Sequence, residues 1–313
     1  SRRVAVIGGG GVSVVDAVSG EAALLLRLQG EEYVSEVAWS PDSGDGRKEL
    51  WKSDGTAAGT RELAQWPSQA DGCVWIELPG RGESSSVVFT VQTSCFSTQE
   101  LWISDGSAER TGRLRTFTDG EALIADGGTR FRGEVYFLGS AQDPESDVLR
   151  HSIWKTDGTP GGTVPIVELP SGYADSPNSL HGTAGAAGIY FPWGDLIHGL
   201  ELWRTDGTAW GTGLLADLQP GGQSSSPFPL WAVGDQVLFA GWTSAAGSEL
   251  WQVDGGLDSP QRVADLYPGP ESSQPLVFAA SDERIFVLAD DGMVGREIWE
   301  VAEPSVAACV ASP

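Results

Sequence analysis

Short apolar segments, each bounded by Gly, Pro, Asp or Ser, recur along the whole of this chain. Between Pro227 and Leu266 the pattern predicts four β-strands, at residues 228–232, 236–242, 248–253 and 261–265. The second of these is almost continuously apolar, which is typical of a strand that is buried on both faces. The connections contain Gly234-Asp235 and Asp254-Gly255, which favour tight hairpin turns. The pattern therefore predicts an all-β protein.

One eight-residue motif sets the spacing of these strands. Residues 201–208 read Glu-Leu-Trp-Arg-Thr-Asp-Gly-Thr, and variants of this motif begin at residues 49, 100, 152, 249 and 297. The six copies have their tryptophans at Trp51, Trp102, Trp154, Trp203, Trp251 and Trp299. Successive tryptophans are 51, 52, 49, 48 and 48 residues apart. A period of this length is typical of β-propellers and solenoids.

Both faces of the motif strand are apolar. Side chains alternate along a strand, so Leu202 points to one face while Trp203 and Thr205 point to the other. A sheet that is apolar on both faces must lie between two others, and the radial stacking of a β-propeller achieves this for every repeat. Each buried indole contributes roughly 3 kcal/mol by area. We expect a β-propeller of four-stranded blades with the six tryptophans in its core, most simply seven blades, with six as the alternative.

The repeat predicts a single domain made of consecutive blade-like units. Their approximate bounds are 1–30, 31–67, 68–118, 119–169, 170–218, 219–266 and 267–313. In the second unit, residues 33–42 resemble a first strand, and no apolar second strand is evident before Trp51. Either this blade is trimmed, or residues are missing from the chain near Asp42 to Gly46. Extra residues within 142–149 predict an extended surface hairpin.

An aspartate follows the motif strand in five copies, at Asp54, Asp105, Asp157, Asp206 and Asp254. Asp can accept hydrogen bonds from amides one or two residues further on, and the following Gly supplies positive φ, so we favour a structural turn. The alternative is calcium binding. Calcium loops present three or more oxygen side chains, and here one acidic residue recurs. Residues 290–292 and 42–45 are slightly better candidates for a metal, and no further cofactor is expected.

The net charge and the lengths of the apolar runs limit the kinds of partner that we expect, and the cysteines leave two possibilities open. The net charge of −24 disfavours nucleic acid and anionic membrane surfaces as partners. The longest apolar runs, about five or six residues, fall far short of the roughly 18 needed for a spanning helix, so no membrane insertion is expected. Of the cysteines Cys73, Cys95 and Cys309, the first two either form a disulfide between neighbouring strands or are free and buried. We favour free thiols.

The repeated residues resemble the bacterial ELWxxDGT repeat family. The resemblance covers roughly residues 49–301, and it is closest in residues 202–230 and 286–299. It implies secreted or surface-attached β-propeller proteins that are common in myxobacteria, with no general activity established for the family. We therefore expect a protein that is secreted, periplasmic or on the cell surface.

The leading functional hypothesis is a non-catalytic binding or scaffold propeller, not an enzyme, with a protein or glycan partner. Its motivation is that the repeated residues have structural roles, whereas propellers vary their loops to make contacts. One alternative is a structural subunit of an envelope or appendage assembly. A second alternative is a propeller hydrolase or lyase with an acidic central site.

Few residues favour the hydrolase alternative at this stage. The histidines, His151, His181 and His198, show no spacing of metal ligands, so we expect surface or capping roles for them and no catalytic residue. Four tryptophans that break the repeat are candidate contact platforms: Trp66, Trp193, Trp210 and Trp242.

Overall fold

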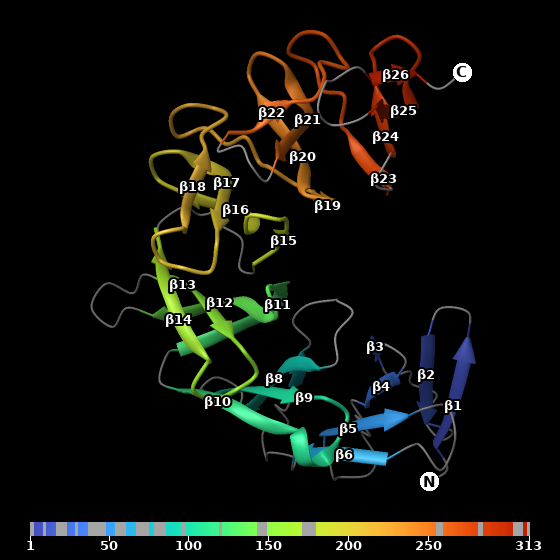
Figure 1. Cartoon of the computed structure of the whole chain (residues 1–313), viewed down its shortest axis with the longest axis vertical. Helices are drawn as coiled ribbons and strands as arrows, with labels where there is room; N and C mark the ends of the chain where they lie inside the picture. The colour runs from blue at the N-terminus through green and yellow to red at the C-terminus, as the bar shows by residue number, and fades with distance from the viewer. Residues whose placement is uncertain are drawn as a thin grey trace. The chain divides into compact units, whose positions relative to one another are not determined.

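The protein is built from short antiparallel β-strands (Figure 1). The computed structural model describes residues 3–8, 11–16, 24–28, 31–36, 48–53, 61–66, 75–77, 86–94, 98–118, 121–142, 149–170, 180–254, 259–280, 284–302 and 309–311. Within these residues the strands form six four-stranded sheets and one two-stranded sheet, β1-β2. The predicted all-β class, with four-stranded antiparallel sheets, is therefore confirmed.

The strands divide between two compact units, residues 1–142 with 154–164 and residues 143–153 with 165–313. The strands up to β12 are β1 (Arg3–Gly8), β2 (Gly11–Asp16), β3 (Leu24–Leu28), β4 (Glu31–Glu36), β5 (Lys48–Ser53), β6 (Arg61–Trp66), β7 (Trp75–Glu77), β8 (Val87–Ser94), β9 (Thr98–Ser104), β10 (Gly112–Thr118), β11 (Glu121–Phe131) and β12 (Glu134–Gln142). The later strands are β13 (Leu149–Thr156), β14 (Val164–Leu169), β15 (Thr183–Ala184), β16 (Ile189–Asp195), β17 (Gly199–Thr205), β18 (Gly213–Ala216), β19 (Leu230–Val233), β20 (Gln236–Thr243), β21 (Gly247–Asp254), β22 (Gln261–Arg262), β23 (Leu276–Ala280), β24 (Arg284–Asp290), β25 (Arg296–Ala302) and β26 (Cys309–Ala311). A 3₁₀ turn, η1, spans Ala108–Arg110.

The four strands predicted between Pro227 and Leu266 match the observed sheet β19-β20-β21-β22 closely. In the first motif sheet the prediction of a missing second strand was wrong. Strand β4 pairs with β5, with Val34 opposite Trp51, and β3 pairs with β4 as the first strand. The segment has glutamates at both ends and a polar face, so its sequence lacks the continuous apolar run of the other second strands.

Several predictions fall on residues outside the described part of the chain. These are the state of Cys73 and Cys95, whether free thiols as favoured or a disulfide, the proposed gap at 42–46, most of the hairpin extension at 142–149 and the turn at Asp54. Cys309 lies in β26.

Neighbouring sheets within each unit stack through their apolar faces. In the first unit, Val88 and Leu101 of sheet β10-β9-β8-β7 pack with Val135 and Phe137 of β12, while Phe89 on the opposite face packs with the preceding sheet. In the second unit, Leu202 packs with Phe239 of the next sheet, and Leu250 packs with Val287 of the one after it. Because Val88 and Phe89 are adjacent, the alternation of the strand serves both interfaces.

The recurring apolar residue of the second strand lies directly opposite the motif tryptophan. The paired residues are Phe89 with Trp102, Phe191 with Trp203, Phe239 with Trp251 and Val287 with Trp299. Trp154 and Trp203 are buried, whereas Trp102, Trp251 and Trp299 are half-buried; the side chain of Trp51 is outside the described residues. The half-buried indoles of Trp251 and Trp299 donate to the carbonyls of Gly241 and Ala289.

A buried glutamate ties each of two sheets to the linker that follows it. The Glu201 side chain accepts hydrogen bonds from the backbone N–H of Leu218 (3.1 Å) and of Ser225 (2.8 Å), and from the Ser225 hydroxyl (2.5 Å). Glu249 repeats the arrangement with Leu266 and Ser273. Both glutamates are fully buried. Burial raises the pKa of each side chain above its ordinary value, and the hydrogen bonds oppose this shift.

The same motif position in the last sheet has a different environment. Glu297 is exposed, and its neighbour Ile298 is 46% exposed. The corresponding residues Leu50, Leu101, Ile153, Leu202 and Leu250 are at most 3% exposed. Ser-Ser pairs follow Glu201 and Glu249 at residues 224–225 and 272–273. Glu201 and Glu249 are thus buried beneath a linker with two serines, whereas the buried Glu100 is bonded to Trp102 and Arg113 instead.

We expect Glu201→Ala to lower the free energy of unfolding by about 3 kcal/mol, because the N–H groups of Leu218 and Ser225 would lose their acceptor inside the protein. Urea denaturation measures this change. Glu297→Ala is the matched control, since it removes the same side chain from an exposed position, and its effect should stay within about 0.5 kcal/mol. Equal losses in the two variants would show that the buried hydrogen bonds do not stabilise the fold.

Candidate active site at the β16–β17 hairpin

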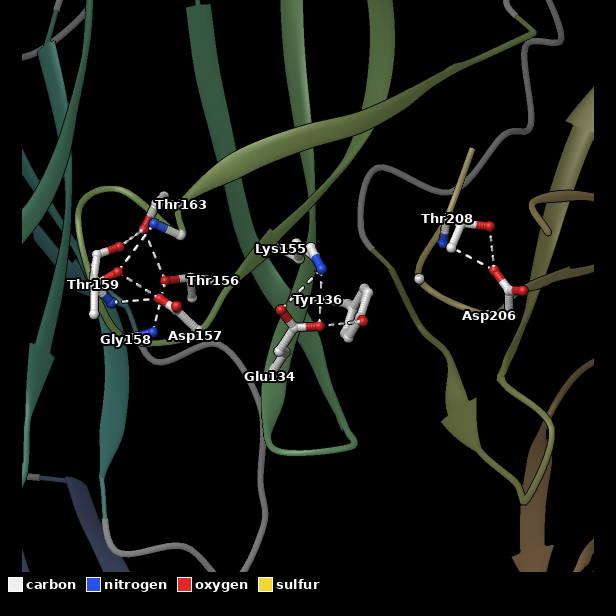
Figure 2. A network of polar contacts seen from close by, with 12 residues as sticks. Glu134, Tyr136, Lys155, Thr156, Asp157, Gly158, Thr159, Thr163, Asp206 and Thr208 are labelled. Carbon is white, nitrogen blue, oxygen red and sulfur yellow. Dashed lines mark hydrogen bonds and ion pairs between the residues drawn. The ribbon is translucent and has the colours of Figure 1, made fainter. Parts of the chain in front are cut away.

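Three of the repeated aspartates, Asp105, Asp157 and Asp206, form closed turns. Asp206 Oδ1 accepts from the N–H and the hydroxyl of Thr208, at 2.9 and 2.7 Å, and Asp157 binds Thr159 in the same way (Figure 2). In both turns a second pair of threonine hydroxyls lies 2.6 to 2.8 Å apart and closes the loop. These contacts hold the carboxylate within its own turn. Beside the Asp157 turn, Glu134 binds Lys155 and Tyr136 (Figure 2).

In the Asp157 and Asp206 turns, the residue five positions after the aspartate must be glycine because the carboxylate lies directly against its Cα. A Cβ on Gly162 or Gly211 would lie 2.0 to 2.1 Å from the carboxylate of Asp157 or Asp206. In the Asp105 turn this position is Arg110, where the chain instead forms η1 and the guanidinium lies 3.5 Å from Asp105. The turn thus tolerates a side chain only with a changed backbone. Asp254 belongs to β21, and no such turn is described for it.

A second type of aspartate turn is found at the tip of the hairpin that joins β16 to β17. Asp195 pairs with Gly199 across the hairpin, and its Oδ1 accepts from the N–H groups of Ile197 (2.8 Å) and His198 (2.7 Å). Gly199 has φ +73°, and a Cβ there would lie 2.4 Å from the Gln223 carbonyl oxygen. The tip is therefore fixed by its own carboxylate and by the neighbouring linker.

The imidazole of His198 lies against the same carboxylate. Nδ1 is 3.0 Å from Oδ1 and 2.8 Å from Oδ2 of Asp195. Asp195 is buried, whereas about a third of the His198 side chain is exposed. This geometry favours the neutral tautomer with hydrogen on Nδ1, so that Nε2 is the basic nitrogen. A histidine oriented by a carboxylate is the arrangement used for general acid–base catalysis.

The electrostatic environment of His198 is acidic. The hydrogen bond to Asp195 raises the pKa of His198, and the charges of Asp195, Asp217 and Glu201 raise it further. The pKa of Asp195 is lowered, because the hydrogen bonds from His198 and Ile197 outweigh the effect of its burial. Asp217 Oδ1 is buried and has no hydrogen-bond partner among the described residues.

The other two histidines lie in different surroundings. His151 in β13 is buried with its ring 5.2 Å from that of Trp193, and burial lowers its pKa. His181 lies near Phe228, at 6.4 Å between ring centroids. The surface or capping role expected for all three therefore fails to describe buried His151. For His198 the expectation missed the pairing with Asp195, which the sequence Asp-Leu-Ile-His-Gly at a strand-to-strand turn could have indicated.

Of the four tryptophans expected as contact platforms, one is well placed for contact. Trp66 and Trp193 are buried, and the Trp193 indole donates to the Pro170 carbonyl at 3.0 Å. Trp242 is half-buried. Trp210 is fully exposed at the β17–β18 turn. Trp66 and Trp193 therefore belong to the packing of the sheets and offer no surface for contact.

The described residues include no cluster of three or more His, Cys, Asp or Glu arranged to hold a metal ion. No helix in the described part of the chain is long and apolar enough to cross a membrane. Asp290 and Asp291 each accept backbone hydrogen bonds in the β24–β25 turn.

Comparison with known proteins gives structural neighbours and no family. No protein-family model matches the chain, and no curated protein matches it by sequence. A puromycin-hydrolyzing peptidase of Mycobacterium tuberculosis is similar over 92% of this chain and 46% of its own, at 14% identity and TM-score 0.46. The propeller domain of the Trilobed protease from Pyrococcus furiosus is similar over 92% and 83%, at 10% identity and TM-score 0.46. The acylaminoacyl peptidase of Pyrococcus horikoshii is similar over 96% of this chain and 48% of its own, at 10% identity and TM-score 0.43.

These matches correct the functional expectation. The prediction of a non-catalytic binding or scaffold protein that is not an enzyme is contradicted, because the similar structures are peptidases and a protease domain. The chain spans about half the length of the two peptidases. At identities of 10 to 14%, the likeness concerns the propeller fold, and an activity has to be argued from this chain's own residues.

We expect Asp206→Asn to flatten the pH dependence of stability in acid. Hydrogen bonds from Thr208 lower the pKa of Asp206 below its ordinary 3.8. A lowered folded-state pKa stabilises the protein above the unfolded pKa, and this contribution is lost as the pH falls through the folded pKa. Asn keeps the acceptor oxygen without the charge. Urea midpoints from pH 5 to 2 should therefore fall more steeply for the wild type than for the variant.

Glu201 and Glu249 act in the opposite direction, since their raised pKa values favour the fold at low pH. The wild type and the Asp206→Asn variant both contain these glutamates, so their contribution to the pH dependence cancels when the two are compared. Parallel curves for wild type and variant would contradict the assignment of the turn.

Proposed function

We propose that this chain is a hydrolase of propeller fold in which His198 transfers protons at the β16–β17 hairpin and Asp195 orients it. The observation that carries the proposal is the contact of 2.8 Å between Nδ1 of His198 and the buried carboxylate of Asp195. The opposite ring nitrogen remains basic, and about a third of the His198 side chain is exposed to solvent.

The chemistry assigned to this pair is general-base hydrolysis. Nε2 of neutral His198 removes a proton from water while the water oxygen attacks the carbonyl carbon of an amide or ester. The imidazolium then gives its proton to the leaving nitrogen or oxygen as the bond to carbon breaks. Asp195 remains ionised throughout and stabilises the imidazolium, in keeping with its lowered pKa and the raised pKa of His198. Peptides are the first substrates to test, because the similar structures include peptidases.

The matching turn in β24–β25 supports a special role for the histidine. Asp291 Oδ1 accepts from the N–H groups of Met293 and Val294, as Asp195 does from Ile197 and His198. Val294 occupies the position of His198. The aspartate therefore suffices to build the turn, and the histidine adds a proton-transfer group to it.

We expect the wild type to hydrolyse unstructured peptides or activated esters, and His198→Gln to lower kcat at least about a hundredfold. The rate should increase with pH through an inflection above 6.5, since only neutral His198 is a base and its pKa is raised. Asp195→Asn should move that inflection to lower pH, because the charge that holds the proton is removed.

Asp291→Asn and His181→Gln are the matched controls, and both should retain the wild-type rate and inflection. Circular dichroism checks that each variant is folded. Hydrolysis no faster than without protein, or an undiminished rate in His198→Gln, would contradict the proposal.

For the architecture, we infer that the sheets close into a seven-bladed propeller. The support is the number of sheets, six four-stranded and one two-stranded among the described residues, and the uncovered face at Ile298. In the preceding sheets the same face is buried against the next one. Class averages from electron microscopy should display seven blades around an axis, and six blades or an open arrangement would contradict this.

A further inference from the structure

Three hydroxyl side chains surround the carboxylate in the closed aspartate turns. In the Asp206 turn they belong to Thr205, Thr208 and Thr212, which lie one residue before the aspartate and two and six residues after it. The N–H of Gly207 donates to Thr205 Oγ1 (3.1 Å), and the Asp206 carboxylate accepts from Thr208. Thr212 Oγ1 lies 2.6 Å from Thr205 Oγ1 and donates to the Thr208 carbonyl. This hydroxyl network holds both the aspartate side chain and the peptide bond that follows it.

The turns after β9 and β13 contain the same network. The Gly106 N–H donates to Ser104 Oγ, and the Gly158 N–H donates to Thr156 Oγ1, both at 3.1 Å (Figure 2). In each turn the carboxylate accepts from the hydroxyl residue two positions further on. The hydroxyl residues are Ser104, Ser107 and Thr111 in one turn and Thr156, Thr159 and Thr163 in the other. Serine and threonine thus serve equally well before the aspartate.

The copy of the motif at Asp254 keeps the Asp-Gly sequence without the hydroxyls. Its residues at the three hydroxyl positions are Val253, Gly256 and Pro260. Val253 is 1% exposed and packs in an apolar cluster with Val237 and Phe239. Its side chain contains no oxygen, so it offers no acceptor to the amide that follows Asp254.

An Asp-Gly bond can rearrange without any other reactant than water. The glycine nitrogen attacks the side-chain carbonyl carbon of the aspartic acid, a water molecule leaves, and a five-membered succinimide forms. Hydrolysis of the ring takes up one water and yields isoaspartate, in which the backbone runs through the former side chain. Glycine favours this reaction because it has no Cβ to obstruct the rotation that brings its nitrogen to the side chain.

The hydroxyl network opposes this rearrangement at two points. The bond from the glycine N–H to the preceding hydroxyl fixes the peptide plane, so its nitrogen cannot turn towards the side-chain carbon. The attack also requires the neutral carboxyl, since a carboxylate is a poor electrophile. Hydrogen bonds from Thr159 and Thr208 lower the pKa of Asp157 and Asp206, which makes the neutral form rarer.

We propose that the hydroxyl network protects the Asp-Gly bonds of the motif turns, and that Asp254, where the network is replaced, is a site of spontaneous isoaspartate formation in the folded protein. The inference is independent of the proposed function. Isomerisation adds one methylene to the backbone directly after the ladder pair of Asp254 with Gln236. It therefore lengthens the connection from β21 to β22.

The first test is incubation of the folded wild type at mildly acidic pH. Peptide mapping with electron-transfer fragmentation distinguishes isoaspartate from aspartate, which has the same mass. We expect isoaspartate to accumulate at Asp254 at least about tenfold faster than at Asp157 or Asp206, because loss of even one or two hydrogen bonds lowers the barrier by that much. In protein unfolded by urea the three rates should become similar, since all three sites have the sequence Asp-Gly.

The second test uses Thr205→Val, which keeps the shape of the side chain and removes the acceptor of the Gly207 N–H. The rate at Asp206 should increase about tenfold, and the rate at Asp157 in the same molecule should stay unchanged as an internal control. Thr205→Ser is the matched variant and should keep the wild-type rate, since Ser104 fills this role in the Asp105 turn.

Three results would overturn the inference. The first is an equal rate at Asp206 and Asp254 in the folded wild type. The second is an unchanged rate at Asp206 in the Thr205→Val variant. The third is an equal increase in the Thr205→Val and Thr205→Ser variants, which would assign the protection to packing instead of the hydroxyl.

Discussion

Burial of both faces of each sheet is the constraint on which this structure depends. A strand such as β8 sends Val88 to one neighbouring sheet and Phe89 to the other, so neither face can be left in water without losing an interface. Short strands and tight turns satisfy the backbone hydrogen bonds inside each sheet. The apolar contacts then act between neighbouring sheets within each unit and hold them against one another.

The buried glutamates add direction to this stacking. Non-directional apolar contacts allow a sheet to slide, whereas Glu201 and Glu249 each bind three donors from the end of their own sheet and from the linker to the next. Each carboxylate tolerates burial because hydrogen bonds replace its lost water. The exposed Glu297, with an uncovered Ile298 beside it, illustrates the reverse case.

The β16–β17 hairpin differs from the β24–β25 hairpin in having a histidine beside the turn aspartate. Its aspartate has the same turn-forming bonds as Asp291, and the histidine makes use of the carboxylate that the turn already holds in place. The histidine is therefore accommodated at the tip of the hairpin, outside the apolar core of the sheets. The exposed Leu196 and Ile197 then offer an apolar surface directly before that group.

The sequence alone determined the all-β class, the strands around each motif tryptophan and the aspartate turns, because alternation, turn residues and a fixed period are local properties of the chain. It did not reveal β4, whose glutamates hide its role as a second strand. It also gave no sign that the motif glutamates Glu201 and Glu249 are buried, and the pairing of His198 with Asp195 was missed. Trp66 and Trp193 were expected as exposed platforms, although both are buried. His198 lies only three residues after Asp195, so its pairing could have been recognised locally, whereas the glutamate and tryptophan roles depend on partners such as Ser225, 24 residues away from Glu201, or on the packing of other sheets. Only the tertiary structure brings them together, since hydrogen bonding and burial across such separations leave no local pattern.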